Sequence, residues 1–371
     1  MIFLHSWEFW IFELDWILRL GRKFPVTHAD IYKKSFDLAY SYLSKSPLYC
    51  SWQVTYRCNF RCSFCGYWKM KTKKEEELSV SDFALGARKL RKIGPLFISM
   101  AGGEPLIRKD LPEIVNAVSS YHFPFITTNG WLVTPDVAKR LFQAGLMGAV
   151  VSLDFADEKK HDENRGKEGA FKRAVAAVKY FVGAKTSKFQ RVDITAVLLK
   201  ENIDEVEKLI ILAKKLGAEF TLQPYANIKT DGHDDVGITD HTITQEVSGH
   251  LLKLKRKYSH FKSSQEYLRR YDDFFQGGID GCQAGRLFFN IDQKGDIAKC
   301  VEDMQNPVGN IKTIGIEELR NALSQKQREN RCKACWYGCR GEVECSYTLN
   351  GVKNTLARII SRDGHRNGSE L

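Results

Sequence analysis

From residue 51 onward, the chain alternates regularly between strand-like and helix-like segments. Runs rich in β-branched and aromatic residues are separated by amphipathic stretches with helix-capping residues. The expected strands are 51–56, 95–102, 123–130, 147–154, 191–199 and 218–225, and the expected helices are 79–93, 110–121, 135–144, 169–184 and 202–217. Strands that alternate with helices in this way indicate an α/β fold with a parallel sheet. The periodicity leaves open whether that sheet is open, a partial barrel or part of an eight-stranded barrel.

Cysteine content is the second constraint, with ten cysteines among 371 residues. Disulfide scaffolds are short secreted chains, and cytosolic proteins are usually poor in cysteine. The N-terminus lacks a basic start and a small-residue cleavage site, which argues against a signal peptide. The cysteines therefore indicate bound metal. The net charge of +11 favours acidic substrates or surfaces but does not by itself indicate nucleic acid, which we do not expect as a partner.

Three of the cysteines, Cys58, Cys62 and Cys65, stand close together as CNFRCSFC directly after the first expected strand. Parallel α/β sheets place their sites at this carboxyl end of the strands. Three thiolates can hold one face of an iron–sulfur cluster, because soft sulfur ligands suit such clusters and zinc alike. No fourth cysteine or histidine follows closely in CGYWKMK, so one iron would stay open for a substrate or cofactor.

CNFRCSFC resembles the Cx3Cx2C signature of radical S-adenosylmethionine (SAM) enzymes, with Phe64 as the aromatic residue before the third cysteine. Further segments similar to that family are AGGEP at 101–105, TTNG at 127–130, SLD at 152–154 and HDENRG at 161–166. The resemblance spans roughly 50–225 and implies a partial (β/α)6 barrel of the TIM type. It also implies a [4Fe-4S] cluster that binds SAM, cleaves it reductively and so starts hydrogen abstraction from an unactivated C–H bond.

The same resemblance implies which side chains contact SAM. Gly102 and Gly103 would let the backbone approach, and Glu104 would hold the amino group. A carboxylate needs a cation, for which Arg165 supplies a planar fork, and an ammonium needs an acceptor such as Glu104. The remaining residues implied to lie at the cofactor are Phe64, Asn129, Ser152 and Gln223. No single side chain is expected to act as the catalyst, because the cofactors carry the hard chemistry.

A second group of cysteines lies in the C-terminal quarter of the chain: Cys282, Cys300, Cys332, Cys335, Cys339 and Cys345. The first part of this region resembles the auxiliary-cluster domains called SPASM and its shortened form, twitch. We expect Cys282, Cys300, Cys332 and Cys335 to close one auxiliary [4Fe-4S] cluster. Either of the other two could replace one ligand, or both could be structural. Two complete auxiliary clusters are disfavoured because the last two cysteine spacings are reversed relative to SPASM, and a four-cysteine zinc site is the rival. Cys50 is expected to be simply buried.

These features divide the chain into five expected parts. They are an amphipathic helical segment (1–50), the radical SAM barrel (51–230), a linker with a basic helix (231–276), the SPASM/twitch-like domain (277–348) and a tail (349–371). Residues 1–23 are apolar with charges on one face, and would form a helix that packs on protein or lies in a membrane interface. The basic run 253–270 would be a solvated helix face or a contact for an acidic substrate or lipid headgroup.

The substrate is not apparent from the sequence. One hypothesis is an enzyme for a hydrophobic or membrane-held molecule, motivated by 1–23 and 253–270. A second is a maturase that modifies a peptide or protein, although only about fifty residues precede the barrel, too few for a separate leader-peptide domain. A third is an iron–sulfur electron carrier or zinc-stabilised scaffold. We expect a cytoplasmic enzyme, peripheral to the membrane if 1–23 contacts lipid, that receives electrons from a donor such as flavodoxin or ferredoxin.

Overall fold

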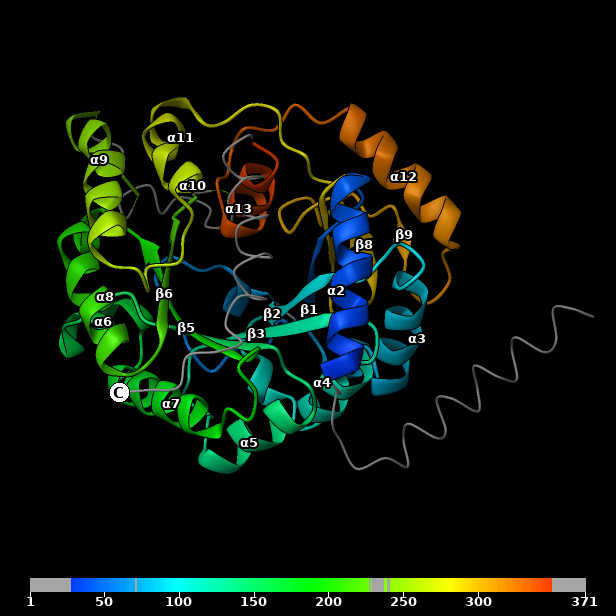
Figure 1. The fold of residues 1–371 in the computed structure, drawn as a ribbon, viewed down its shortest axis with the longest axis horizontal. Coiled ribbons are helices and arrows are strands. Elements are labelled where there is room, and N and C mark those ends of the chain that lie inside the picture. The colour runs from blue at the N-terminus through cyan, green and yellow to red at the C-terminus, as the bar shows by residue number, and fades with distance from the viewer. Residues whose placement is uncertain (1–27, 71, 227, 229–236, 239–240, 349–371) are drawn as a thin grey trace, which may run out of the picture.

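The computed structural model describes residues 28–348 except for 71, 227, 229–236 and 239–240 (Figure 1). The segment 1–23 and the tail 349–371 therefore lie outside the described residues. The described N-terminal helix is α2 (His28–Leu43). One side of α2 exposes Tyr32, Phe36, Tyr40 and Leu43. Within the described part of the chain, no helix has the length and apolar character needed to cross a membrane.

Six parallel strands form the centre of the molecule, and the helices between them cover one face of the sheet (Figure 1). The strands are β1 (Tyr49–Thr55), β2 (Phe97–Gly102), β3 (Phe123–Thr128), β4 (Gly148–Ser152), β5 (Arg191–Leu198) and β6 (Glu219–Pro224). The intervening helices are α3 (Val80–Leu90), α4 (Leu111–Ser119), α5 (Pro135–Gln143), α6 (Glu158–Arg165), α7 (Ala170–Ala184) and α8 (Val206–Lys215). Short 3-10 turns are η1 (Tyr67–Lys69), η2 (Lys74–Glu76), η3 (Pro105–Ile107) and η4 (Lys200–Glu205). This arrangement is a partial (β/α)6 barrel, as expected from the sequence.

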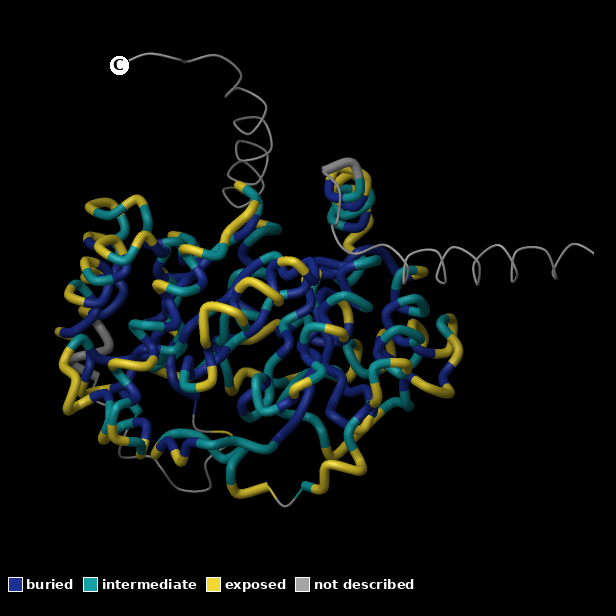
Figure 2. Tube along the Cα trace, turned by 90° about the horizontal axis from the view of Figure 1, so that it is seen from below, coloured by how far each residue is buried: buried dark blue, intermediate teal, exposed yellow. Residues whose placement is uncertain are grey.

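Strand residues alternate between the helix-packed core and the inner face of the curved sheet. Ile194, Ala196 and Leu222 are buried in the main apolar cluster. Between them, Ser152 pairs in register with Thr195, and Thr195 with Thr221, so these three hydroxyls form a row across the inner face. Figure 2 shows the buried residues gathered in the middle of the molecule, with exposed residues toward its outside. The inner face therefore carries a row of hydroxyl groups from the end of β4 to the middle of β6.

The C-terminal region continues this sheet. β7 (Phe288–Ile291) pairs parallel to β1, and β8 (Asp296–Ala298) and β9 (Gly309–Asn310) add antiparallel strands beyond it. The sheet order is β6-β5-β4-β3-β2-β1-β7-β8-β9. The expected boundary near residue 230 therefore does not separate two sheets. Strands that are adjacent in space here are distant in sequence, which periodicity cannot reveal.

Helices from the C-terminal half pack beside the other edge of the barrel, at β6. Phe220 of β6 forms a bridge with Phe261, which precedes α10 (Gln265–Arg269) and α11 (Tyr271–Gly277). In α13 (Gly338–Ser346), Gly341 lies against the ring of Tyr267, where an added Cβ would lie 2.3 Å from a ring carbon. α13 also contacts β1 and β7, so it joins the two edges of the open barrel (Figure 1).

The basic run 253–270 begins in α9 (His241–Lys257). Lys257 pairs with Glu207 at 2.7 Å, Lys262 with Glu219 at 3.3 Å and Arg269 with Glu266 at 2.7 Å. Lys253 and Arg256 are exposed. These ion pairs favour the interpretation of this run as a solvated surface.

Candidate active site and auxiliary-cluster region

Cys58, Cys62 and Cys65 follow β1 at the carboxyl edge of the sheet and share a small apolar cluster with Phe60 and Phe64. All three are free thiols. Burial raises the pKa of the Cys58 thiol to about 12 and that of Cys62 to about 11, and the neighbouring thiols add to both shifts. The Cys58 and Cys62 thiols are therefore protonated in the metal-free protein, and metal binding must release their protons.

Two glycines bring the end of β2 against the segment that carries these cysteines. Gly102 has φ 124°, and a Cβ there would lie 2.0 Å from the carbonyl oxygen of Thr55. At Gly103 a Cβ would lie 2.1 Å from the carbonyl oxygen of Arg57. The next residue, Glu104, donates its backbone N–H to that same Arg57 oxygen at 2.9 Å. The glycines thus permit a backbone approach, which positions Glu104 beside the cysteine loop.

The Glu104 side chain is 1% exposed, so it is not a surface acid. Oε1 accepts hydrogen bonds from the Thr128 hydroxyl at 2.8 Å and the Leu106 N–H at 3.0 Å, and Oε2 accepts one from the Asn129 N–H at 2.8 Å. A carboxylate offers about four lone-pair sites, which leaves one on Oε2. Burial raises the pKa of Glu104 to about 6, although these hydrogen bonds and Arg165 oppose the shift. Glu104 can therefore accept one further donor.

Arg165 ends α6 and lies near enough to Glu104 for its charge to oppose the rise that burial causes in the Glu104 pKa. It is 7% exposed, and its Nη2 pairs with Asp154 Oδ2 at 2.7 Å. The guanidinium carbon lies 5.1 Å from the centre of the Phe64 ring, and its charge opposes the rise that burial causes in the pKa of the Cys62 thiol. Its Nε is buried without an acceptor in the described protein. A buried donor without a partner indicates a missing acceptor.

The other expected cofactor residues lie on neighbouring strands. Asn129, 8% exposed, donates from Nδ2 to Asn59 Oδ1 at 2.8 Å and so ties the end of β3 to the cysteine loop. Ser152 ends β4, and Gln223 lies near the end of β6; both are half-buried on the inner face. The structure thus gathers Phe64, Glu104, Asn129 and Arg165 around the three cysteines, with Ser152 and Gln223 facing inward from the strands.

The second cysteine group forms another cluster. Burial raises the pKa of the Cys335 thiol to about 12. Cys282 and Cys300 lie close enough for their charges to add to this shift. Burial opposes the raised pKa of Lys299, which Asp303 and the nearby charges of Cys300 and Cys332 produce, so both cysteines lie near Lys299. Asn330 donates to the Cys282 carbonyl oxygen at 3.1 Å and accepts from the Cys332 N–H at 3.2 Å. These contacts bring four cysteines from three segments together.

Arg340 of α13 fixes the segments that carry these cysteines. It is fully buried and donates to the carbonyl oxygens of Cys335 at 2.8 Å and Ile279 at 2.6 Å. Its Nε also bonds Glu344, which in turn accepts the Gln283 N–H at 2.8 Å. Sequence analysis missed Arg340 because its role depends on its contact with the segment at Ile279, which is 61 residues away along the chain.

Cys339 and Cys345 are six positions apart on α13, which places them about 120° apart around the helix. Cys345 is 4% exposed in the main core, where burial and Glu342 raise the pKa of its thiol to about 12. Burial raises the pKa values of Tyr49 and Tyr267, and the charge of nearby Cys339 adds to both shifts. Cys50 is completely buried in β1, as expected.

Residues 52–213 match the family model of the radical SAM superfamily. The chain carries a radical SAM domain. This radical SAM enzyme is 26% identical over 330 residues to mycofactocin maturase MftC of Mycolicibacterium smegmatis, covering 83% of this chain and 80% of that relative. It is 25% identical over 334 residues to AdoMet-dependent heme synthase of Methanosarcina barkeri, covering 81% of this chain and 93% of that protein.

Two solved structures share the fold of this radical SAM enzyme. Streptococcus suis SuiB bound to precursor peptide SuiA has a TM-score of 0.62 and 18% identity, covering 82% of this chain and 74% of SuiB. The structure of anSMEcpe with bound AdoMet has a TM-score of 0.60 and 14% identity, covering 84% of this chain and 100% of that chain. They support a partial barrel followed by a Cys-rich C-terminal auxiliary domain.

The cofactors of this radical SAM enzyme are SAM and a [4Fe-4S] cluster, with an auxiliary cluster in the Cys-rich region, and the residues present fit them. Three thiols adjoin a carboxylate with one spare acceptor site and a guanidinium with one spare donor. Among the described residues, no three metal-ligating side chains converge tightly enough to hold a single ion.

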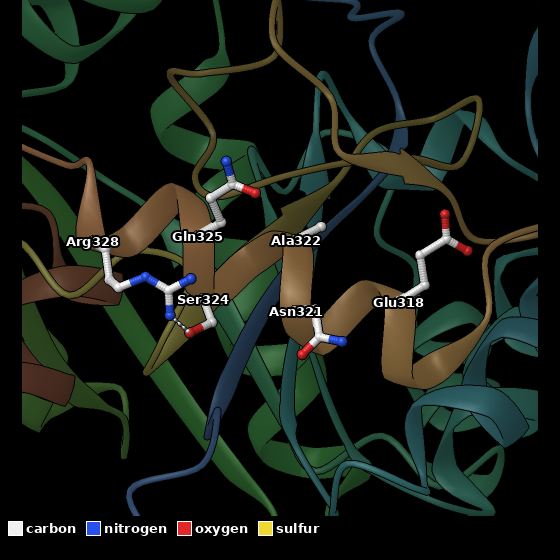
Figure 3. Close-up of a pocket in the computed structure, with 6 residues that line it drawn as sticks. All are labelled: Glu318, Asn321, Ala322, Ser324, Gln325 and Arg328. Atoms are coloured by element: carbon white, nitrogen blue, oxygen red, sulfur yellow. Dashed lines mark hydrogen bonds between the residues drawn. The ribbon is translucent and has the colours of Figure 1, made fainter.

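A surface hollow of about 670 Å³ lies elsewhere, along α12 (Ile316–Arg328) (Figure 3). Its lining residues are Glu318, Asn321, Ala322, Ser324, Gln325 and Arg328. All belong to one helix, and Arg328 donates to Ser324 at 3.1 Å across it. The hollow contains no cysteine, so we do not assign it to the chemistry.

Proposed function

We propose that this radical SAM enzyme cleaves SAM reductively and abstracts a hydrogen atom from an unactivated C–H bond of a peptide substrate. The observation that carries the proposal is the grouping of Cys58, Cys62 and Cys65 with Glu104 and Arg165 at one edge of the sheet. When bound, the reduced cluster and SAM would supply methionine and a 5′-deoxyadenosyl radical.

The side chains of the chain itself position the reactants. Cys58, Cys62 and Cys65 would ligate three irons and leave the fourth open. Glu104 Oε2 would accept a hydrogen bond from the SAM ammonium, and Arg165 Nε would donate one to the SAM carboxylate. Binding both groups of the amino acid part would fix the position of the sulfonium. An external one-electron donor such as flavodoxin or ferredoxin would reduce the cluster.

The peptide substrate rests on the relatives and on the inner face of the barrel. One relative is named as a maturase, and one structure of the same fold is bound to a precursor peptide. The inner-face row of Ser152, Thr195 and Thr221 hydroxyls provides hydrogen-bonding groups that suit a polar substrate. A second candidate is a hydrophobic small molecule, favoured by the similarity to the heme synthase along 93% of that relative.

In the auxiliary region, we propose that Cys282, Cys300, Cys332 and Cys335 close one [4Fe-4S] cluster. Their mutual proximity supports this set. Cys345 lies in the main core and Cys339 on another side of α13, so we assign neither as a ligand. Ligation by four cysteines leaves no open iron, which favours electron transfer over substrate binding at this cluster.

The decisive experiment uses the full chain, reconstituted with iron and sulfide without oxygen and reduced with dithionite. We expect about eight irons per chain and the formation of 5′-deoxyadenosine and methionine from SAM. Replacing Cys58, Cys62 and Cys65 by Ala should leave about four irons and abolish SAM cleavage. Replacing the four auxiliary cysteines should also leave about four irons but retain SAM cleavage, and Cys50→Ala should retain both clusters.

Failure of the reduced, loaded protein to cleave SAM would contradict the proposal and favour an electron carrier. Zinc retained by the auxiliary cysteines would contradict the second cluster, and about twelve irons would indicate two auxiliary clusters. The substrate class is tested by incubating the active enzyme with peptides encoded beside its gene. A SAM-dependent mass change in such a peptide supports a maturase, whereas conversion of a tetrapyrrole instead would support the second candidate.

A further inference from the structure

Asp154, immediately after β4, is a buried carboxylate without an assigned role. It has no exposed surface, and its Oδ1 accepts the Val197 N–H at 3.0 Å. Its Oδ2 accepts Asn164 Nδ2 at 2.9 Å and Arg165 Nη2 at 2.7 Å. Both oxygens are therefore committed to groups of the protein itself, so Asp154 does not need a ligand as its partner.

The backbone of Asp154 is held as firmly as its side chain. Its N–H donates to Nδ1 of the buried, neutral His161 at 3.2 Å, and its carbonyl oxygen accepts Asn202 Nδ2 at 3.0 Å. Contacts from α6, from β5 and from the turn before α8 thus converge on one residue. A carboxylate fixed from three sides can orient an arginine more strictly than one on a mobile loop.

Arg165 is the group that this carboxylate orients. With Nη2 held by Asp154 and the guanidinium over the Phe64 ring, Arg165 lies beside the cysteine loop. The Ser63 N–H also donates to the Asn164 carbonyl oxygen at 3.3 Å, which joins this loop to the end of α6. Cys62 belongs to the three-cysteine group, so the positive charge of Arg165 would act on a thiolate that ligates iron. Hydrogen bonds to cluster sulfurs and nearby positive charge favour the reduced cluster, which carries one more electron.

We propose that Asp154 is a positioning residue that holds the Arg165 guanidinium beside the cysteine loop, and that the positive charge of Arg165 thereby raises the reduction potential of the SAM-binding cluster. The inference rests on the proposed function, because it requires a cluster on Cys58, Cys62 and Cys65. It adds a second role to Arg165, since Nε stays available to the SAM carboxylate while Nη2 is held by Asp154.

The direction in which Asp154→Asn shifts the reduction potential distinguishes a positioning role of Asp154 from a direct effect of its charge on the cluster. Asp154 is itself negative and lies close enough to act on Cys62. Removing its charge alone would make the site more positive and would raise the potential. Releasing Arg165 from its position beside the cysteine loop would lower the potential. If Asp154 acts through Arg165, Asp154→Asn lowers the potential despite the loss of a negative charge.

The test is a potentiometric titration of the reconstituted full chain, in which electron paramagnetic resonance measures the amount of reduced cluster at each potential. The variants are Asp154→Asn, Arg165→Gln, the double variant and Asp193→Asn, each with the four auxiliary cysteines replaced by Ala so that one cluster is observed. Asp193 is a matched control, because it is also a buried partner of an arginine, Arg191 at 3.2 Å, but lies toward the opposite end of β5.

We expect Arg165→Gln to lower the ratio of reduced to oxidised cluster about tenfold at a fixed potential, which is ~59 mV for one electron. Asp154→Asn should shift it in the same direction, and Asp193→Asn should not shift it. In the Arg165→Gln background, Asp154→Asn should no longer lower the potential. An unchanged potential in Arg165→Gln, or a rise in Asp154→Asn alone, would overturn the inference.

The two proposals fail in different ways. A protein that assembles no cluster on Cys58, Cys62 and Cys65 disproves the proposed function before any potential is measured. A protein that assembles the cluster and cleaves SAM, but shows equal potentials in all variants, disproves only the role of Asp154 and Arg165. If Asp154→Asn does not fold, Arg165→Lys provides the remaining test. It keeps the charge but loses the planar fork, so we expect a smaller decrease than in Arg165→Gln.

Discussion

At the scale of single residues, Glu104 combines complete burial with one unused acceptor site. Its carboxylate accepts three hydrogen bonds that fix its orientation toward the cysteine loop. A carboxylate held in this way is preorganised for an ammonium, because binding requires little further ordering. The structure therefore makes the charge of Glu104, rather than its size, the property to test.

We predict that Glu104→Gln weakens SAM binding about tenfold to a hundredfold, because hydrogen bonds to charged groups contribute about 1.5–3 kcal/mol. Calorimetry of SAM binding to the reconstituted protein measures this change, with iron content as the check that the cluster is still present. Glu113→Gln is the matched control, because Glu113 is 55% exposed and lies 3.7 Å from Arg140 on the outer surface. Equal SAM affinity in both variants would contradict the assignment of Glu104.

At the scale of elements, the close contact between α13 and α10 should determine whether the auxiliary region assembles. Gly341→Ala places a methyl group 2.3 Å from the Tyr267 ring, and overpacking of this kind typically costs about 1–3 kcal/mol. We expect a lower melting temperature and loss of auxiliary iron, with the SAM-binding cluster retained. Gly338→Ala on the same helix meets nothing within 4 Å and should retain both clusters. Similar iron contents in the two variants would argue against this contact.

His122 joins three elements and should make their packing depend on pH. Its Nδ1 accepts the Leu96 N–H at 3.1 Å, and its Nε2 bonds the Ala87 carbonyl oxygen at 2.8 Å. Burial lowers the pKa of His122 to about 3. Between that pH and about 6.5, the unfolded chain binds a proton that the folded protein does not, so the free energy of unfolding falls as pH falls, by at most about 1.4 kcal/mol per pH unit.

Urea unfolding of the full chain at pH 7 and pH 5.5 measures how the free energy of unfolding depends on pH. We predict that His122→Asn is less stable at pH 7 but loses less stability on acidification than the original protein does. His161, whose pKa burial lowers to about 2, should maintain part of the slope. Val118→Ala, a fully buried packing variant, is the control and should lower stability equally at both pH values. An unchanged slope in His122→Asn would rule out His122 as its source.

The sequence predicted those parts of the site that are local along the chain. The spacing of Cys58, Cys62 and Cys65 and the GGE segment stood at strand ends, and the strands themselves were visible from their apolar runs. Asp154 was visible within SLD, but its role depends on Val197 and Arg165, which only the fold brings to it. The same holds for Arg340, whose partner Ile279 lies 61 residues away along the chain.

At the scale of the whole molecule, the position of β7 changes how the C-terminal region should be understood. All four residues of β7 are buried, and the strand pairs with β1, which leads directly into the cysteine loop. Gln53 of β1 also donates to Asn290 of β7 at 3.0 Å. An auxiliary region that shares a sheet with the barrel cannot unfold without exposing the edge of β1. The two cluster regions should therefore be mechanically and thermodynamically linked.

We predict that the barrel and the auxiliary region unfold together in one cooperative transition. Phe289→Ala removes a ring that is 1% exposed in β7 and contacts the main core, and such changes cost about 3–5 kcal/mol. Because β7 borders β1, this variant should destabilise the barrel as well as the auxiliary region. Phe36→Ala, at a site that is 79% exposed, is the control and should change little.

The measurement is urea unfolding without oxygen. Far-ultraviolet circular dichroism monitors the barrel helices. Fluorescence of Trp336 monitors the auxiliary region in a protein whose other tryptophans are replaced by Phe. Coincident transitions that shift together in Phe289→Ala support a single unit, because independent domains would give separate midpoints. A fluorescence transition that shifts alone would mean that the auxiliary region unfolds while β1 to β6 persist. In that case the β1–β7 pairing would be too weak to couple the two cluster regions.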